Sequence, residues 1–181
     1  MTKTVQRVLC LCGSLRRLSS NAAALEAARQ LAPATLELVR YDGLGQLPLF
    51  NPDIEVDPLP APVLALRAVV GQADALLIAC PEYAHGVPGA FKNLLDWLVG
   101  SLEFPGKPVL LLNTAARGSY HAQAALDEIL RTMSAQLLTT QACVVSLPGA
   151  GCSADQVLAS SERCTELRAA LAILAGSLPV A

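Results

Sequence analysis

The sequence predicts an α/β fold of three layers, with helices on both faces of a doubly wound, five-stranded parallel sheet. Five short apolar runs rich in Val, Leu and Ile alternate with longer amphipathic stretches, and such runs are typical of strands buried on both faces. Strict strand-helix alternation implies right-handed crossovers, because parallel neighbours cannot be joined by hairpins. The predicted strands are residues 5–11, 35–39, 75–79, 108–112 and 142–146.

The amphipathic stretches between these strands predict the helices. Small and apolar side chains recur on one helical face of residues 20–32, and Pro33 stops that helix. The Pro-rich segment 48–62 is predicted to be a surface loop, with neither a domain boundary nor an internal repeat. We therefore interpret residues 1–181 as one domain. The other predicted helices are residues 62–72, 88–100, 121–135 and 155–175.

Composition limits the classes of partner. A chain of 181 residues with 53% hydrophobic residues can bury a core without disulfides or a structural metal. Only 15% of the residues are charged, the net charge is −2 and like charges do not cluster, so we expect small-molecule partners rather than nucleic acid or membrane. The apolar stretches are far shorter than the roughly 20 residues that span a bilayer. The start of the chain leaves no room for a signal peptide before Gly13, so we expect a cytoplasmic protein.

The cysteines and histidines do not predict a metal site. The two histidines, His85 and His121, have no third ligand at useful spacing. Four cysteines lie in or beside apolar runs and two are scattered, which favours reduced packing residues over disulfides or ligands. These cysteines are Cys10, Cys12, Cys80, Cys143, Cys152 and Cys164.

The loop after the first strand favours a phosphate. It begins at Gly13 and enters an Ala-rich helix, whose N-terminus offers free amides and a favourable dipole. Arginine can add charge-assisted bonds, and the alternative is that a serine merely caps the helix while the arginines are solvated. Neither G-x-G-x-x-G nor the P-loop pattern occurs, which argues against a dinucleotide fold or a nucleotide triphosphatase. The polar side chains available are those of Ser14, Ser19, Ser20 and Asn21.

The loop after the third strand makes the prediction specific. Residues 80–97 read Cys-Pro-Glu-Tyr-Ala-His-Gly-Val-Pro-Gly-Ala-Phe-Lys-Asn-Leu-Leu-Asp-Trp. Together with Gly-Ser-Leu-Arg at residues 13–16, this sequence resembles the NADPH-dependent FMN reductase family, which shares the flavodoxin-like fold with quinone and chromate reductases. The resemblance spans the chain from the first strand to the helix after the fourth, with both motifs in the right order.

The resemblance implies an FMN site built from these two loops. It assigns the phosphate to Ser14, Arg16, Ser19 and Asn21, and the lining of the isoalloxazine ring to residues 81–86, which are Pro81, Glu82, Tyr83, Ala84, His85 and Gly86. A turn between Pro81 and Gly86 exposes backbone amides to the ring, and Tyr83 can place its aromatic face against it. Such amides would stabilise the charge that hydride uptake creates.

The chain departs from the family pattern at two loops. Members commonly carry asparagine after the tyrosine, where Ala84 stands here, and His85 then follows as either a proton donor or a solvated bystander. After the fourth strand the family's glycine-rich loop is reduced to Gly118. Thr114 and Arg117 of this loop are further candidates for contact with the flavin or with a nicotinamide phosphate.

The resulting hypothesis is an oxidoreductase in which NADPH reduces bound FMN and a second substrate takes the electrons at the same face. Quinones, azo compounds, metal oxyanions and free flavin all suit such a site as acceptors. The alternative is a flavin-binding electron carrier or sensor without turnover. A hydrolase is disfavoured, because no G-x-S-x-G elbow occurs. The resemblance also implies a homodimer or homotetramer with the site near the interface.

Overall fold

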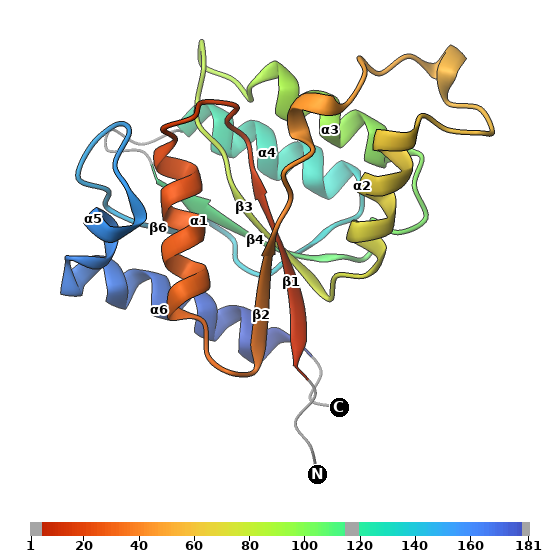
Figure 1. Cartoon of the computed structure of the whole chain (residues 1–181). Coiled ribbons are helices and arrows are strands. Elements are labelled where there is room, and N and C mark those ends of the chain that lie inside the picture. Colours follow the sequence, from red (N-terminus) through yellow and green to blue (C-terminus); the bar gives the residue numbers. More distant parts are fainter. Residues whose placement is uncertain (1–4, 115–119, 179–181) are drawn as a thin grey trace.

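Residues 5–114 and 120–178 are described by the structure, a computed structural model (Figure 1). The central sheet is parallel throughout, and its strand order is β2-β1-β3-β4-β5. This is the doubly wound order that the alternating pattern predicts. The first four strands match the predicted runs to within one residue at each end: β1 Gln6–Cys12, β2 Leu36–Arg40, β3 Ala75–Ala79 and β4 Pro108–Asn113.

The fifth position of the sheet differs from the prediction. A strand over 142–146 was expected, but two short strands, β5 Gln136–Leu137 and β6 Cys143–Val144, pair in succession with the two ends of β4. The amide of Leu138 still donates to the carbonyl of Val109 at 3.0 Å, and residues 139–142 lie outside both strands. In this interval the hydroxyl of Thr139 donates to the carbonyl of Gln141 at 2.6 Å. Such local side-chain bonds compete with strand pairing, and the apolar pattern alone does not reveal them.

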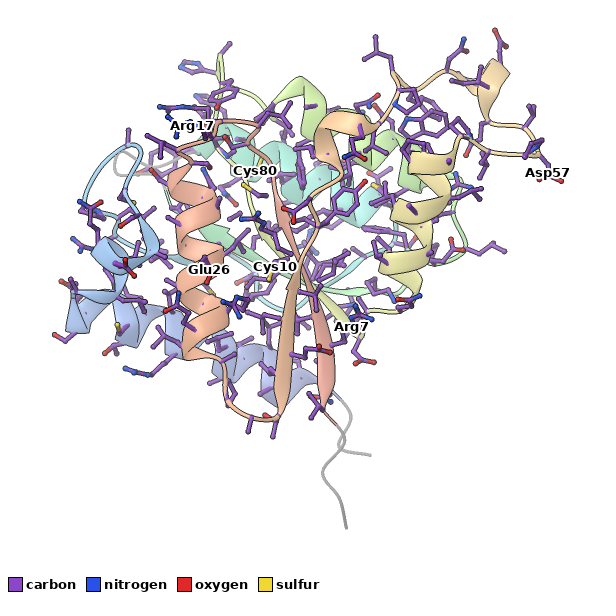
Figure 2. All side chains as sticks on the ribbon, in the orientation of Figure 1. Arg7, Cys10, Arg17, Glu26, Asp57 and Cys80 are labelled. Carbon is purple, nitrogen blue, oxygen red and sulfur yellow. The ribbon has the colours of Figure 1, made fainter. Side chains whose placement is uncertain are left out.

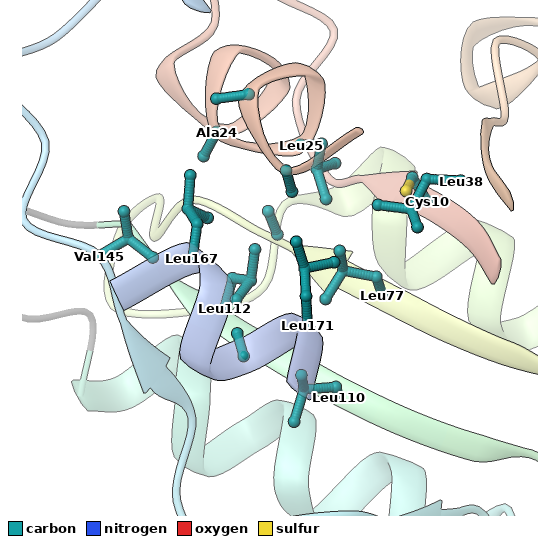
Figure 3. Packing of buried hydrophobic residues seen from close by; sticks show 14 of the residues in the cluster. Cys10, Ala24, Leu25, Leu38, Leu77, Leu110, Leu112, Val145, Leu167 and Leu171 are labelled. Carbon is teal, nitrogen blue, oxygen red and sulfur yellow. The ribbon is translucent and has the colours of Figure 1, made fainter. Parts of the chain in front are cut away.

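The helices form two layers. Apolar side chains of α1 and α6 pack with Val8 and Cys10 of β1 on one face, and those of α2, α3 and α4 pack with Leu9 and Leu11 on the other. Figure 3 shows the first of these clusters, to which Leu25 of α1 and Leu171 of α6 both belong. The helices are α1 Ser20–Leu31, α2 Ala61–Gly71, α3 Gly89–Val99, α4 Tyr120–Thr132, α5 Ala154–Leu158 and α6 Ser161–Ser177.

The last predicted helix, 155–175, is divided into α5 and α6. The hydroxyl of Ser160 accepts from the amide of Arg163, so Ser160 starts a new helix. Ser153 and Gln156 form a capping box at the start of α5. The expected loop 48–62 contains a short 3-10 helix, Pro52–Ile54, and is otherwise irregular up to α2. Within the described residues, no helix has the length and apolarity needed to cross a membrane.

Candidate functional site

The carboxyl ends of β1, β3 and β4 bring three loops together. After β1 the chain enters α1 on one face of the sheet, whereas after β3 it enters α3 on the other, so the two connections diverge between neighbouring strands. This divergence is the switch point at which doubly wound folds bind ligands. The loops predicted to hold a ligand therefore share one end of the molecule.

Gly13 fixes the loop after β1 against the loop after β3. Its amide donates to the carbonyl of Ala79 at 2.9 Å. A Cβ atom at this position would collide with the Sγ atom of Cys80 and would lie 3.1 Å from the Cys80 Cα atom. Glycine is thus required by a close approach of two backbones.

The arginines of the loop after β1 are exposed and unpaired. Neither Arg16 nor Arg17 forms an ion pair with another described residue, and Figure 2 shows Arg17 at the same end of the sheet as Cys80. The Ser14 hydroxyl accepts from the amide of Arg16 at 3.3 Å, which shapes the turn. Both arginines and Arg40 of β2 line a cavity of about 250 Å³, in which Arg40 is already paired with Asp42.

At the start of α1, the residues predicted to bind the phosphate make different contacts. The hydroxyl oxygen of buried Ser19 accepts from the amide of Ala22, which makes Ser19 the N-cap. Buried Asn21 accepts through Oδ1 from Thr114 at 2.8 Å, and its Nδ2 group makes no hydrogen bond within the described parts of the chain. No acidic residue occupies the first turn, so the positive end of the helix dipole is not neutralised.

Ser20 behaves differently from its neighbours. Its hydroxyl donates to the carbonyl of Gly149 at 3.0 Å and accepts from the amide of Gly151 at 2.8 Å. A hydroxyl has one proton, so Ser20 has none left for a ligand. This link to the loop before α5 was not predicted, although Pro-Gly-Ala-Gly at residues 148–151 signals a turn there.

The loop after β3 makes a tight turn with unusual backbone angles. Tyr83 and Gly86 exchange two backbone hydrogen bonds of 3.1 and 3.0 Å, and between them Ala84 and His85 have φ angles of 49° and 58°. Two residues with positive φ between such a pair are typical of a type I′ turn. Neither residue is a glycine, so the turn stores backbone strain.

Two contacts hold this turn to the N-terminus of α4. A carboxylate oxygen of Glu82 accepts from the amide of Ala122 at 2.9 Å. The imidazole of His85 stacks on that of His121, with ring centroids 4.4 Å apart and an angle of 12° between the rings. His121 was not among the residues predicted for the site. Its position in the first turn of the helix that follows β4 could have indicated that it lies near the site.

The residues after β4 complete the site only in part. Buried Thr114 lies at its edge and donates to Asn21, which joins the loops after β1 and β4. Arg117, the other candidate on this loop, lies outside the described residues. Among those that are described, no group of three His, Cys, Asp or Glu side chains could hold a metal ion.

The buried thiols of Cys10 and Cys80 are not activated. Burial raises the pKa of the Cys80 thiol, with a smaller contribution from Cys12, and burial raises the pKa of Cys10 to about 12. Thiols of this kind stay protonated at neutral pH and are poor nucleophiles. All six cysteines are free, as expected.

A comparison with known families identifies the chain. The family model described as NADPH-dependent FMN reductase matches residues 6–148, which include all three loops. The chain belongs to this family. It is therefore an oxidoreductase that uses FMN and NAD(P)H, as the two loop motifs predicted.

Relatives and solved structures agree with this family. The chain is 36% identical to a quinone reductase of Escherichia coli K12 over 129 residues, which are 66% of this chain and 69% of that protein. It is 38% identical to an NAD(P)H-dependent FMN reductase of Pseudomonas aeruginosa over 128 residues, with the same shares of each chain. The fold resembles that of FerB, a flavoenzyme NAD(P)H:(acceptor) oxidoreductase from Paracoccus denitrificans, with a TM-score of 0.75 and 26% identity over 97% of this chain and all of that one. An NADH:FMN oxidoreductase shares the fold at a TM-score of 0.70 and 21% identity, with 98% and 92% covered.

Proposed function

We propose that this member of the family passes electrons from NAD(P)H through FMN to a quinone. The observation that carries the proposal is the linkage of the three loops by Gly13, Asn21 and Glu82, which forms one site from three strand ends. The quinone is supported by similarity to the E. coli quinone reductase. Azo compounds, metal oxyanions and free flavin are further acceptors of the proposed site.

The loop after β1 suits the phosphate of FMN. Arg16 brings a positive charge and Asn21 an Nδ2 donor, neither of which has a partner among the described residues, and α1 brings an N-terminus without a carboxylate. Ser14 and Ser19 accept hydrogen bonds through oxygen, and their own protons can turn toward the phosphate. We propose that Ser20, whose proton is used, positions the loop instead.

The loop after β3 suits the edge of the isoalloxazine ring. The type I′ turn consumes the amides of Tyr83 and Gly86, which leaves the amides of Ala84 and His85 without a backbone partner in the described chain. Donors of this kind would hold the ring and stabilise negative charge on it. Bound FMN supplies the hydride chemistry, while Pro81, Glu82 and Thr114 shape and fix the surrounding loops.

We propose that the nicotinamide and the acceptor use the same open face in turn. Tyr83 is 47% exposed beside this face and offers an aromatic surface to either substrate. The extra phosphate of NADPH would meet Arg17 or Arg117, and the cavity beside Arg17 supports the first of these. Sharing one face predicts ping-pong kinetics, and an arginine at the extra phosphate predicts a preference for NADPH.

The decisive experiment mixes the FMN-loaded protein with each nicotinamide in a stopped-flow instrument without oxygen and then adds a quinone. We expect flavin absorbance to bleach, faster with NADPH than with NADH, and to return when the quinone is added. Flavin that does not bleach with either nicotinamide would instead indicate the electron carrier or sensor.

Binding of the cofactor is tested separately by thermal unfolding. A ligand that binds only the native state raises the melting temperature by mass action. We expect FMN to raise it more than riboflavin does, since riboflavin lacks the phosphate. Equal shifts would remove the role that we propose for the loop after β1.

We also infer a homodimer or homotetramer in the cytoplasm. Exposed apolar side chains in the loops before α2 and after α3, including Leu49 and Leu102, which are 84% and 94% exposed, support burial between subunits. Light scattering after size exclusion would give the mass of the assembly, and a mass of 18.9 kDa would contradict it. Cell fractionation would test the location.

A further inference from the structure

The cavity of about 250 Å³ at the loop after β1 extends to the end of β2, away from the loops that we assign to the flavin ring. The strand order β2-β1-β3-β4 puts β2 at the edge of the sheet, on the other side of β1 from β3 and β4. Ser14 and Arg16 line this cavity, but Ser19 and Asn21 at the start of α1 and Thr114 after β4 do not. The cavity therefore borders the proposed phosphate site of FMN without being the same space.

The walls of the cavity are fixed by close contacts between the two loops. The side chain of Leu15 lies against Gly45 of the 3-10 helix Leu44–Gln46, which follows β2. The amide of Tyr41 donates to the carbonyl of Cys10 at 3.1 Å and keeps the end of β2 beside β1. Gly43 leaves room for the phenol of Tyr41, with which a Cβ atom at this position would collide. The cavity is thus a formed part of the fold.

Arginine dominates the charge of the cavity. Arg16, Arg17 and Arg40 line it with one carboxylate, Asp42, so positive charge is in excess among the described lining residues. Guanidinium groups gathered around one space repel one another, and a bound anion removes that repulsion. Because Arg16 is assigned to the FMN phosphate, Arg17 and Arg40 are left for a second anion. A volume of about 250 Å³ is smaller than most sites that hold a whole ligand, which suits one phosphorylated end of a larger molecule.

Arg40 has donors in reserve. Its Nε atom donates to a carboxylate oxygen of Asp42 at 2.6 Å, whereas its Nη groups have no hydrogen-bond partner within residues 5–114 and 120–178. The Nη edge of a guanidinium pairs with phosphate oxygens. Both side chains of the pair are exposed, at 49% and 71%, so their ion pair contributes little to stability. Arg40 can therefore turn toward an anion at small cost.

We propose that this cavity binds the 2′-phosphate on the adenosine end of NADPH, with Arg17 and Arg40 as its ligands and Asp42 as the group that opposes it. The proposal rests on the proposed function, in which the nicotinamide lies at the face beside Tyr83. The adenosine half then crosses the loop after β1 toward the end of β2. Arginine attracts the 2′-phosphate, while a carboxylate repels it and accepts from the ribose hydroxyl that NADH carries instead. The balance between Arg40 and Asp42 thus sets the preference between the two nicotinamides.

The test compares adenosine 2′,5′-bisphosphate with adenosine 5′-monophosphate, each titrated by calorimetry into the FMN-loaded protein. These nucleotides differ only in the 2′-phosphate, and neither can reduce the flavin. We expect the bisphosphate to bind about tenfold more tightly or better, by a margin that shrinks in high salt. Equal affinities would overturn the proposal. Release of FMN by the bisphosphate would also overturn it, because both phosphates would then occupy one site.

Variants with opposite effects locate the phosphate. Arg40→Ala should lower the affinity for the bisphosphate about tenfold and bring it close to that for the monophosphate. Asp42→Asn should raise it by up to about fivefold, because the competing carboxylate is gone. The matched control is Arg131→Ala, since Arg131 of α4 is also exposed and paired with a carboxylate, that of Asp127, but lies outside the cavity. Undiminished binding in Arg40→Ala, or weaker binding in Asp42→Asn, would contradict the assignment.

Stopped-flow reduction separates this inference from the proposed function. In Arg40→Ala the preference for NADPH over NADH, taken as the ratio of flavin bleaching rates at low nicotinamide concentration, should fall about tenfold. Flavin that bleaches equally with both nicotinamides in the parent, together with equal affinities for the two nucleotides, would refute the phosphate site and leave the reductase standing. Selective binding of the bisphosphate without any bleaching would support the phosphate site and contradict the reductase.

Discussion

The loops after β1 and β3 meet at Gly13 but are built in opposite ways. The first loop has no strained residue at its close contact, because Gly13 allows the approach to Cys80 and Ser19 caps the helix that follows. The second holds two non-glycine residues, Ala84 and His85, at positive φ and depends on Glu82 to fix it to α4. The first loop leaves side-chain charges free, and the second leaves backbone amides free.

This difference indicates a division of labour. A phosphate needs charge and several donors, which Arg16 and a helix N-terminus supply with little backbone constraint. A flat ring needs donors at fixed positions, and a strained turn supplies them at the expense of stability. Substitutions of the exposed side chains in the first loop should therefore affect affinity, and those in the second should affect stability as well.

The largest effect is expected where the two loops touch. Gly13→Ala places a methyl group against the side chain and backbone of Cys80, which cannot move apart without disturbing β3. Overpacking of this kind destabilises by about 3 kcal/mol at the upper end of its range. Urea unfolding measures the loss. Gly176→Ala, in α6 with open space around the position, should instead leave stability unchanged or raise it by up to about 1 kcal/mol.

The next effect separates the two arginines of the first loop. Arg16→Ala should weaken FMN binding about tenfold or more, because a charge-assisted hydrogen bond contributes about 1.5 to 3 kcal/mol. Arg17→Ala is the matched control, equally exposed and unpaired, and should change FMN affinity much less. Fluorescence titration of FMN gives both constants. Equal and small losses would mean that backbone amides bind the phosphate alone.

The sequence predicted the first loop better than the second. Gly-Ser-Leu-Arg followed by an Ala-rich helix carries its own signals for a turn, a cap and a phosphate. The type I′ turn does not, because such turns usually show Asn or Gly where this chain has Ala84 and His85. Family resemblance placed residues 81–86 at the flavin, but only the structure revealed the strain and the stacked His121.

The fifth strand is likewise a feature that the sequence pattern predicted poorly. Four strands were predicted closely, and β1, β3 and β4 are buried, largely apolar runs that have few other solutions. At the fifth position the hydroxyl of Thr139 donates to the carbonyl of Gln141 where the chain lies outside the sheet. Contacts between residues distant in sequence, such as Ser20 with Gly149, could not be predicted from the sequence either. They arise from packing rather than from local pattern.

A smaller effect tests the strain of the second loop. Ala84→Asn should raise the free energy of unfolding by about 1 kcal/mol, because asparagine tolerates the left-handed region that alanine avoids. Chemical unfolding without flavin measures the gain. Ala34→Asn, at an exposed turn position without positive φ, should stay within about 0.5 kcal/mol of the parent. Ala84→Asn should also restore the side-chain contact of the family's asparagine and raise FMN affinity. A loss of stability in Ala84→Asn would mean that the turn is not strained at this residue.

The smallest effect concerns an arginine that, unlike those of the first loop, is paired with a carboxylate. On α1, Arg29 donates two hydrogen bonds to Glu26, and these bonds lower the pKa of Glu26 to about 2. Figure 2 shows Glu26 along the helix, away from Arg17. Because the folded pKa is lower than the unfolded value of 4.5, the pair stabilises the protein above about pH 4.5 and loses this contribution as the pH falls toward 2.

Glu26→Gln should therefore lower stability by about 0.5 kcal/mol at pH 7, a small value because Arg29 is 52% exposed and solvent screens the pair. The difference from the parent should shrink as the pH falls from 4.5 toward 2, and also in high salt. Urea unfolding at several pH values measures it. Glu37→Gln, at an exposed carboxylate without an ion pair in the described chain, should show neither trend. FMN affinity should be unchanged in Glu26→Gln, because Arg29 lies in the last turn of α1 and the proposed phosphate lies at the first. A change in FMN affinity would instead show that charge along the whole helix, rather than Arg16 alone, sets the attraction of this loop for phosphate.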